Sequence, residues 1–358
     1  MSTKTTNTAN SPYILILGMG GTIAGVASNP SANTLQYEAG QLGVDTLLSQ
    51  LKQGLPEGIE LISEQLANIN SRNLSEGLLT QLGNRVREAL ANPEVSGIVI
   101  THGTDTLEET GIFLQSTCSK LAASLGKRVV LTGAMLPANA PRADGPKNLM
   151  AAIQWAATPI DNCPGGVYGV FAGQVCLAAD LAKRHSSALN APIQDSPSSP
   201  MHLINPSWLS MVRETQASFL ADLPIPAEDA WPWVEILTSH GGAREASVAH
   251  WLKTGVRGLV VAGSGLGGFH DAWKWALEEA AKQGIAIVRS TRTGAGPVYP
   301  GIPEHDAPGF MASGKLSSPK ARVALQLALN AADLQGGSAK SLTWQDFFAR
   351  IADLPEVR

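Results

Sequence analysis

Residues 97–110 read G-I-V-I-T-H-G-T-D-T-L-E-E-T and bring together residue types that can do chemistry. The β-branched run at 98–100 predicts a buried strand, and the residues after Asp105 predict a helix. Between the two lie the Thr104 hydroxyl, the Asp105 carboxylate and a helix N-terminus, whose N–H groups can hold an anion. The same residues also fit ordinary helix capping, with Asp105 as N-cap and Glu108 completing a capping box.

A second candidate is the threonine that follows the first predicted strand. Residues 18–25 read G-M-G-G-T-I-A-G, and the strand–glycine arrangement suggests a dinucleotide fingerprint. That spacing fails, because Ile23 stands three residues after Gly20 where a glycine is required. We interpret the glycines as letting the backbone approach a small ligand to which Thr22 presents its hydroxyl. A plain glycine turn is the alternative.

Two further side chains lie in predicted loops. Residues 28–43 are polar and long for a connection inside a compact domain, which is typical of an active-site lid. Tyr37 is the only aromatic residue in this loop. It could carry a proton or cover the site, or it could simply anchor the loop. Lys183 lies in a later loop, where a solvated charge is the ordinary interpretation.

The elements that must position these residues alternate between strands and helices. The chain has 358 residues, of which 44% are hydrophobic, and this length favours two domains. We predict an α/β fold with a largely parallel sheet in each domain, the N-terminal domain being larger. The predicted strands are 13–17, 59–69, 97–101, 128–131, 166–171, 174–177, 234–237, 258–261 and 285–289. The predicted helices are 75–90, 105–123, 147–157, 246–253, 270–282 and 318–332, the last of these capped by Ser318, with a final helix beginning at Thr343.

The predicted domain organisation has four parts. Residues 1–12 form a disordered tail, 13–218 the catalytic domain, 219–232 a proline-rich linker and 233–358 the C-terminal domain. No apolar run approaches the ~18 residues needed to span a bilayer. The N-terminus lacks the pattern of a signal peptide, so we expect a cytoplasmic protein.

Composition excludes several classes of function. Net charge is −4 with no basic stripe, so nucleic acid is not an expected partner. The three cysteines, Cys118, Cys163 and Cys176, have the spacing of neither a disulfide framework nor a zinc site. We expect them to be small, mostly buried apolar residues.

Four stretches in order resemble the bacterial-type L-asparaginase and glutaminase-asparaginase family. They are G-G-T-I-A-G at 20–25, T-H-G-T-D-T-L-E-E-T at 101–110, T-G-A-M at 132–135 with A-D-G-P-x-N-L at 143–149, and Lys183 in its loop. The similarity extends into the C-terminal half at 258–265 and 309–329, so it covers nearly the whole chain.

The resemblance implies hydrolysis of a side-chain amide to a carboxylate and ammonia, with a threonine nucleophile and with no metal or other cofactor. It also implies a homotetramer, built as a dimer of dimers, in which the neighbouring subunit completes each site. Thr22 matches the nucleophile and Tyr37 the lid tyrosine. Thr104, Asp105 and Lys183 match the second catalytic cluster.

Substrate recognition is implied by a second set of positions. Ser71 matches a residue that binds the α-carboxylate of the substrate, and Asp105 can either hold Lys183 charged or bind the α-ammonium group. Backbone N–H groups near Thr104 or Gly21 can stabilise the oxyanion. We therefore expect a substrate-binding set of Ser71, Arg72, Gly21, Gly103, Asp105 and Glu304.

Three departures from the family pattern concern recognition rather than bond cleavage. Arg72 stands where the family often has Gln, beside the carboxylate-binding serine. Leu266 and Gly268 lie in a glycine-rich turn in which many relatives have Asn. Glu304 is the nearest candidate for the family's intersubunit glutamate, although its spacing differs.

Three functions remain open at the level of the sequence. The first is an amidohydrolase acting on free L-asparagine, and the second is the same chemistry on glutamine. The third is a non-catalytic amino-acid sensor that has kept the pocket. Retention of both threonines, the aspartate and the lysine argues against a sensor, which would not need Lys183.

Overall fold

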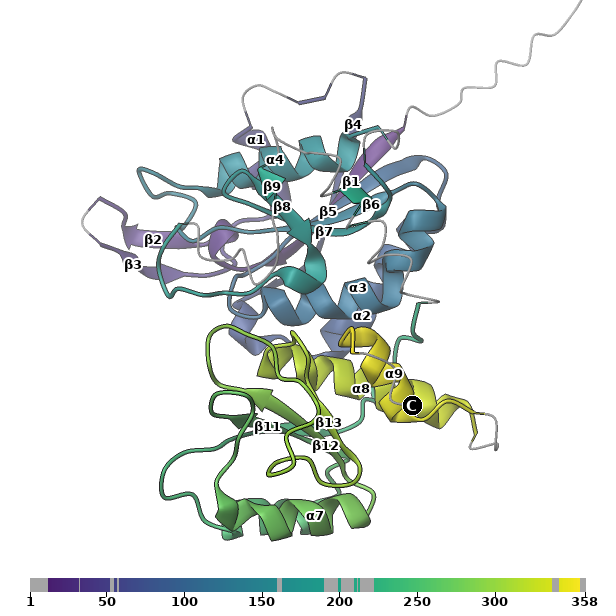
Figure 1. The fold of residues 1–358 in the computed structure, drawn as a ribbon. Helices are drawn as coiled ribbons and strands as arrows, with labels where there is room; N and C mark the ends of the chain where they lie inside the picture. Colours follow the sequence, from purple (N-terminus) through teal and green to yellow (C-terminus); the bar gives the residue numbers. More distant parts are fainter. Residues whose placement is uncertain are drawn as a thin grey trace, which may run out of the picture.

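The computed structural model describes residues 12–31, 33–51, 55–56, 58–159, 163–189, 199–200, 209–210, 212, 222–336 and 341–354. These residues form two separate sheets with helices around them and a short two-stranded ribbon (Figure 1). The predicted tail lies outside the described residues except for Pro12, and so do residues 219–221 of the predicted linker. The predicted α/β class is confirmed.

The larger sheet has seven strands in the order β4-β1-β5-β6-β7-β8-β9. The first five are parallel to one another, whereas β8 pairs antiparallel with β7 and β9 pairs antiparallel with β8 at one edge. Their bounds are β1 Tyr13–Gly20, β4 Glu60–Ile69, β5 Val95–Thr101, β6 Arg128–Thr132, β7 Gly166–Phe171, β8 Gln174–Leu177 and β9 Ser199–Pro200. The chain leaves β1 toward β4 and then returns across β1 to β5. The strand order therefore reverses between β1 and β5, and the carboxyl ends at such a switch point are where open α/β sheets bind ligands.

Helices cover both faces of this sheet, which explains why its inner strands β1, β5, β6 and β7 are almost fully buried, whereas the edge strand β4 carries polar, partly exposed residues. In β1, Leu15 and Leu17 face the helices α2 (Glu76–Ala91) and α3 (Leu107–Ser124). Ile14 and Ile16 face α1 (Val44–Ser49) and α4 (Gly145–Ala157) on the other side. Alternate side chains of β1 thus pack into two hydrophobic cores, one on each face of the sheet.

The smaller sheet is fully parallel, in the order β10-β11-β12-β13. The strands are β10 Val234–Thr238, β11 Gly258–Gly263, β12 Ala286–Thr291 and β13 Phe310–Ala312. The short helix α6 (Ala246–Ala249) and α7 (Lys274–Lys282) cover one face. The helices α8 (Ser318–Leu334) and α9 (Trp344–Ile351) lie toward the first sheet (Figure 1).

Helix α8 belongs to both halves of the molecule. Its apolar side chains share one buried cluster with α2 and α3 of the larger sheet and with β10, β11 and β12 of the smaller one. The described part of the predicted linker runs along the same boundary, where the Pro226 carbonyl accepts a hydrogen bond from Thr80 Oγ1 at 2.9 Å. Trp231 Nε1 donates to the same Thr80 oxygen at 2.9 Å. The two halves are therefore packed together rather than merely tethered.

Several local predictions were wrong. The helix predicted over 246–253 is split into α6 and a 3-10 turn at Trp251–Lys253. The N-cap of α8 is Ser317, whose hydroxyl accepts from the backbone N–H of Lys320, whereas Ser318 is buried against Ser290. The predicted lid loop contains an antiparallel ribbon, β2 (Val26–Asn29) with β3 (Asn33–Glu38).

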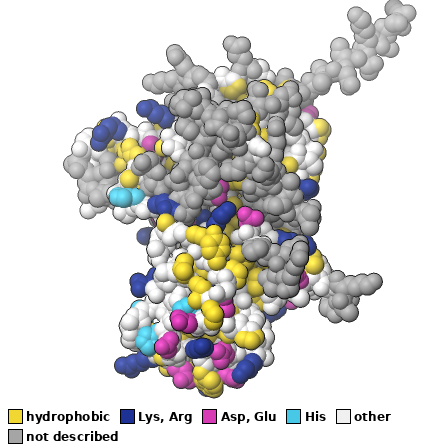
Figure 2. Space-filling view, in the orientation of Figure 1, with side chains coloured by type: hydrophobic (Ala, Val, Ile, Leu, Met, Phe, Trp, Pro, Cys, Tyr) yellow, Lys and Arg dark blue, Asp and Glu magenta, His cyan; other side chains and the backbone are white. Residues whose placement is uncertain are grey.

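The predicted state of the cysteines is confirmed, because all three are buried and none forms a disulfide bond. Burial raises the pKa of the Cys118 thiol to about 11, so it stays protonated at neutral pH. No helix among the described residues combines the length and apolarity needed to cross a bilayer. Acidic and basic side chains are mixed over the visible face of the smaller sheet's half (Figure 2).

Candidate active site

The turn after β1 holds the Thr22 hydroxyl where β1 meets β5. Gly20 and Gly21 have φ of 84° and 81°, a conformation that favours glycine. A Cβ atom on Gly21 would overlap the backbone of Gly103 in the turn after β5. The two turns can therefore touch only because Gly21 has no side chain. Thr22 begins a short 3-10 turn and is buried, with 7% of its surface exposed.

The β2–β3 ribbon brings a phenol to the Thr22 hydroxyl. Thr22 Oγ1 and Tyr37 OH are 2.8 Å apart, and either oxygen can donate the hydrogen bond. A Cβ atom on Gly25 would lie 2.8 Å from the Tyr37 ring, so this glycine lets the ring lie close to the turn. The two residues that the sequence could place only on separate loops thus form one hydrogen-bonded pair.

A second cluster lies after β5. Lys183 Nζ is 2.6 Å from Asp105 Oδ1, and the side chain of Lys183 is 23% exposed against 48% for Asp105. Thr104 beside them is buried. The prediction that Asp105 caps α3 was wrong: the helix begins at Leu107, Thr106 occupies the N-cap position, and no side-chain capping bond is present there. The carboxylate is directed to Lys183 instead.

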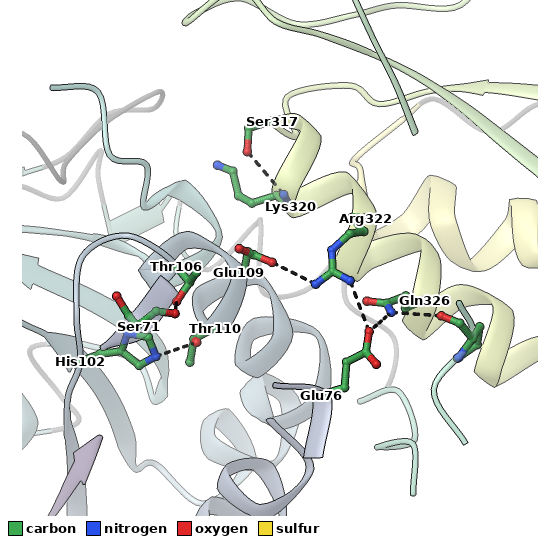
Figure 3. A network of polar contacts seen from close by, with 11 residues as sticks. Ser71, Glu76, His102, Thr106, Glu109, Thr110, Ser317, Lys320, Arg322 and Gln326 are labelled. Carbon is green, nitrogen blue, oxygen red and sulfur yellow. Dashed lines mark hydrogen bonds and ion pairs between the residues drawn. The ribbon is translucent and has the colours of Figure 1, made fainter. Parts of the chain in front are cut away.

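Ser71 joins this cluster from the end of β4. Its hydroxyl accepts a hydrogen bond from the Asp105 backbone N–H at 3.3 Å, and its carbonyl accepts one from Thr106 Oγ1 at 2.9 Å (Figure 3). A Cβ atom on Gly103 would overlap the Ser71 hydroxyl. The turns after β4, β1 and β5 therefore converge at the switch point, and the glycines at 21 and 103 set how closely they approach.

His102 is a buried site residue to which the sequence analysis gave no role. Its Nδ1 lies 2.7 Å from the Gly103 carbonyl and its Nε2 lies 3.0 Å from Thr110 Oγ1 (Figure 3). A carbonyl only accepts, so Nδ1 carries the proton and Nε2 accepts from the threonine. Burial lowers the pKa of His102. The neutral ring thereby ties the Gly103 turn to the first turns of α3.

The third motif of the resemblance supports the turn after β5 from the other side. The Asp144 carboxylate accepts from the backbone N–H groups of Met135 and Leu136, at 2.9 Å for each of the shorter contacts. Asn148 Nδ2 donates to the Gly133 carbonyl at 3.0 Å. A Cβ atom on Gly133 would overlap the His102 carbonyl. These residues act on the shape of the loop rather than on a ligand.

Two predicted substrate-binding residues, Arg72 and Glu304, do not join the two clusters, and neither does Leu266, a departure from the family pattern. Arg72 is exposed and faces a hollow of about 290 Å³ that is also lined by Glu76, Glu109 and Arg322. Its guanidinium makes no hydrogen bond or ion pair with any of the described residues, and Glu76 contacts Arg322 and Gln326 instead. Glu304 is exposed on a loop of the smaller sheet's half, and Leu266 is 61% exposed.

The site as described consists of hydroxyls, one carboxylate, one ammonium group and backbone N–H groups. Within the part of the chain that the structure describes, no group of three or more His, Cys, Asp or Glu side chains is arranged to hold a metal ion. The arrangement presents the Thr22 hydroxyl on one turn, an ion pair on the next, and polar backbone between them. This set is suited to attack on a polar carbon whose oxygen becomes negatively charged.

Comparison with known proteins places this geometry in context. Residues 13–213 match the family model "Asparaginase, N-terminal", and residues 233–335 match "Glutaminase/Asparaginase C-terminal domain". L-asparaginase 2 of Bacillus subtilis is 33% identical over 89% of this chain and 82% of its own length. L-asparaginase 2 of Escherichia coli is 33% identical over 89% of both chains. The crystal structure of a probable cytoplasmic L-asparaginase from Campylobacter jejuni aligns with a TM-score of 0.73 at 31% identity, covering 95% of this chain and 99% of that one.

The buried histidine predicts a pH dependence of stability. Its pKa is lowered in the folded state, so below its ordinary value of about 6.5 the unfolded chain binds a proton that the folded chain does not. The free energy of unfolding should therefore fall as pH drops from about 7 to about 5, by up to about 1.4 kcal/mol per pH unit from this group. Urea unfolding across that range measures the slope.

The variant His102→Gln removes this titrating group and should flatten the slope, although it is less stable overall. His240 is exposed, so His240→Gln serves as the matched control and should keep the wild-type slope. An unchanged slope in His102→Gln would show that the buried ring does not titrate as described.

Proposed function

Because this chain belongs to the asparaginase family of hydrolases, we propose that it hydrolyses L-asparagine to L-aspartate and ammonia with Thr22 as the nucleophile. The observation that carries the proposal is the 2.8 Å hydrogen bond between Thr22 and Tyr37 at the switch point. The turn that holds Thr22 is in contact, through Gly21 and Gly103, with the turn that leads to the Asp105–Lys183 ion pair. A threonine hydroxyl is a weak nucleophile and needs a partner that takes its proton.

In the first step, Thr22 Oγ1 attacks the side-chain amide carbon of the substrate. Its proton passes to the Tyr37 hydroxyl as Tyr37 gives its own proton to the departing amide nitrogen, so the phenol is unchanged at the end of the step. The carbon–nitrogen bond breaks, ammonia leaves, and an ester links the aspartyl group to Thr22. Backbone N–H groups beside Gly21 and Thr104 face the oxygen that becomes negative, and one such donor commonly contributes about 3 kcal/mol to the barrier reduction.

In the second step, water attacks the ester. Its oxygen becomes part of the aspartate carboxylate, and one of its protons restores the Thr22 hydroxyl. In the ion pair with Asp105, Lys183 is an ammonium group, which donates hydrogen bonds and accepts none. We propose that Lys183 acts as a proton donor on the Thr104 side of the substrate. The exposed half of the Asp105 carboxylate remains available for the substrate's α-ammonium group.

The α-carboxylate of the substrate is assigned to the Ser71 side of the site. Ser71 is buried beside Gly103, and Arg72 follows it with a guanidinium that makes no hydrogen bond or ion pair with the described residues. Gly21 and Gly103 contribute backbone rather than side chains. Support for this assignment comes from the convergence of these turns.

Assembly and location form part of the same proposal. We propose a homotetramer in which a neighbouring subunit completes each site, with Glu304 as a candidate contributor, because the resemblance implies this arrangement. A cytoplasmic location also stays a prediction, since one similar protein is named a probable cytoplasmic enzyme and another a probable periplasmic one.

The alternatives differ in what they require of the site. A glutaminase-asparaginase of Pseudomonas fluorescens is 32% identical over 79% of this chain, so glutamine is the competing substrate. A sensor would need the pocket but not the Asp105–Lys183 pair or the Thr22–Tyr37 pair. Ammonia release with asparagine, with glutamine and with neither separates the three functions.

Removing either hydroxyl should stop turnover. Thr22→Ala removes the nucleophile, and Thr104→Val replaces the second hydroxyl by a methyl group of similar volume. We expect each to lower kcat for asparagine by about 100-fold or more. The measurement is ammonia release, with circular dichroism to verify the fold.

Thr254→Val is the matched control, because Thr254 makes only a local bond to the Trp251 carbonyl in the other half of the chain. It should keep wild-type turnover. Near-normal activity in Thr22→Ala would remove Thr22 from the mechanism, and near-normal activity in Thr104→Val would do the same for Thr104.

Arg72 should influence the choice between asparagine and glutamine. An arginine fork can bind a carboxylate through two parallel hydrogen bonds and so fix the distance from that carboxylate to Thr22. One methylene is worth only about 1–3 kcal/mol in a simple apolar pocket, and a rigid anchor makes the wrong length more costly. We expect a preference for asparagine that narrows in Arg72→Gln, measured as the ratio of kcat/KM for the two substrates.

Arg257 forms an exposed ion pair with Asp333 in the other half of the chain, so Arg257→Gln should leave this ratio unchanged. If Arg72→Gln also leaves it unchanged, Arg72 has no part in substrate choice and only lines the hollow between the two halves.

A further inference from the structure

The first turn of α8 contains a buried cation that the proposed mechanism does not use. Lys320 is 1% exposed, and its Nζ donates a hydrogen bond to the Ala179 carbonyl at 3.0 Å. Burying an ammonium group costs free energy unless charges and hydrogen bonds compensate it. Burial lowers the pKa of Lys320, and the carboxylates of Glu108 and Asp180 oppose this shift by favouring the charged form.

A partly buried carboxylate of α3 lies within the field of this cation. Ser317 Oγ, the N-cap of α8, donates to Glu108 Oε2 at 2.9 Å and also accepts from the Lys320 backbone N–H. Burial raises the pKa of Glu108, and the charge of Lys320 opposes that shift most strongly, followed by the Ser317 hydroxyl. At the boundary between the two halves, Glu108 and Lys320 thus offset part of the cost of burying each other's charge, and the Ser317 hydroxyl stabilises the Glu108 carboxylate.

The two segments that α8 holds here are the two that carry the Asp105–Lys183 ion pair. Glu108 stands three residues after Asp105, in the first turn of α3. Ala179 stands four residues before Lys183, in the 3-10 turn Ala178–Asp180. Because Ser317 contacts the first segment and Lys320 the second, one helix turn fixes both with respect to each other.

We propose that Ser317 and Lys320 are positioning residues, which hold Asp105 against Lys183 by bracing from α8 the two backbone segments that carry them. This inference rests on the proposed function, since it assigns Lys183 and Asp105 to the reaction. The half of the chain that contains the smaller sheet would then help to shape the active site of the same chain, in addition to anything it contributes to a neighbouring subunit.

A separate contact of α8 provides an internal comparison. Arg322 contacts Glu76 at 3.3 Å and Glu109 at 3.2 Å, and Gln326 Nε2 donates to Glu76 at 2.6 Å (Figure 3). Gln326 also donates to the Pro232 carbonyl at 3.0 Å. The Arg322 bonds dock the same helix onto α2 and α3, and the Gln326 bonds dock it onto α2 and the linker. Unlike those of Lys320, the Gln326 bonds do not reach the segment that carries Lys183.

The test compares Lys320→Met and Ser317→Ala with Gln326→Leu. A displacement of about 1 Å at reacting groups can cost about 100-fold in rate, so we expect kcat for asparagine to fall about 10- to 100-fold in Lys320→Met. Ser317→Ala should lose less and Ser317→Thr, which keeps the hydroxyl, should recover wild-type turnover. KM should change by less than about 3-fold, because substrate contacts remain.

Gln326→Leu should lower the midpoint of thermal unfolding and leave kcat near its wild-type value. If Lys320→Met and Ser317→Ala instead behave as Gln326→Leu does, the first turn of α8 only docks the two halves and the inference is wrong. If Lys320→Met does not fold, the pair Ser317→Ala and Ser317→Thr decides, and equal kcat in both overturns the proposal.

A double-mutant cycle with Lys183→Met separates this inference from the proposed function. If Lys320 acts through Lys183, adding Lys320→Met to Lys183→Met should lower kcat little further. Fully additive losses would contradict the inference while leaving Lys183 in the reaction. Near-normal turnover in Lys183→Met alone would overturn both the assigned role of Lys183 and the positioning proposal that depends on it.

Discussion

The close approach of two backbone turns is the constraint on which this site depends. Gly21, after β1, and Gly103, after β5, touch where any side chain would overlap, and Gly103 in turn touches Ser71. Neighbouring parallel strands place their carboxyl ends at one edge of a sheet, but only glycine allows the turns to close over that edge. The Thr22–Tyr37 pair and the Asp105–Lys183 pair therefore follow two turns whose contact leaves no room for a side chain at either glycine.

Polar groups buried around that contact keep it rigid. His102 ties the Gly103 turn to α3, Asp144 holds the loop after β6, and the first turn of α8 braces α3 and the segment before Lys183. Each of these groups makes at least one hydrogen bond within the fold, and a hydrogen-bonded buried network favours one arrangement over others. Preorganisation of this kind is what a reaction by a weak nucleophile requires, because the energy of aligning the groups is supplied by folding.

Much of this could be predicted from the sequence, because strands, glycine turns and motif order are local signals. The runs at 13–17 and 97–101 became β1 and β5, and the residues singled out beside them lie at their carboxyl ends. What failed depended on distant partners. Asp105 has the local signal of an N-cap, yet it pairs with Lys183, 78 residues further along the chain. His102 reads as a loop residue, and only the packing of three turns shows that it is buried. The bond between Lys320 and Ala179 joins residues 141 apart, which no local pattern predicts.

We propose above all that Thr22, activated by Tyr37, forms the covalent bond with the substrate. The most direct test is rapid acid quenching of the enzyme during turnover of asparagine, followed by proteolysis and mass spectrometry of the peptides. We expect an aspartyl ester on the peptide that contains Thr22, with none in Thr22→Ala. An ester on the peptide that contains Thr104, with Thr22 unmodified, would contradict it.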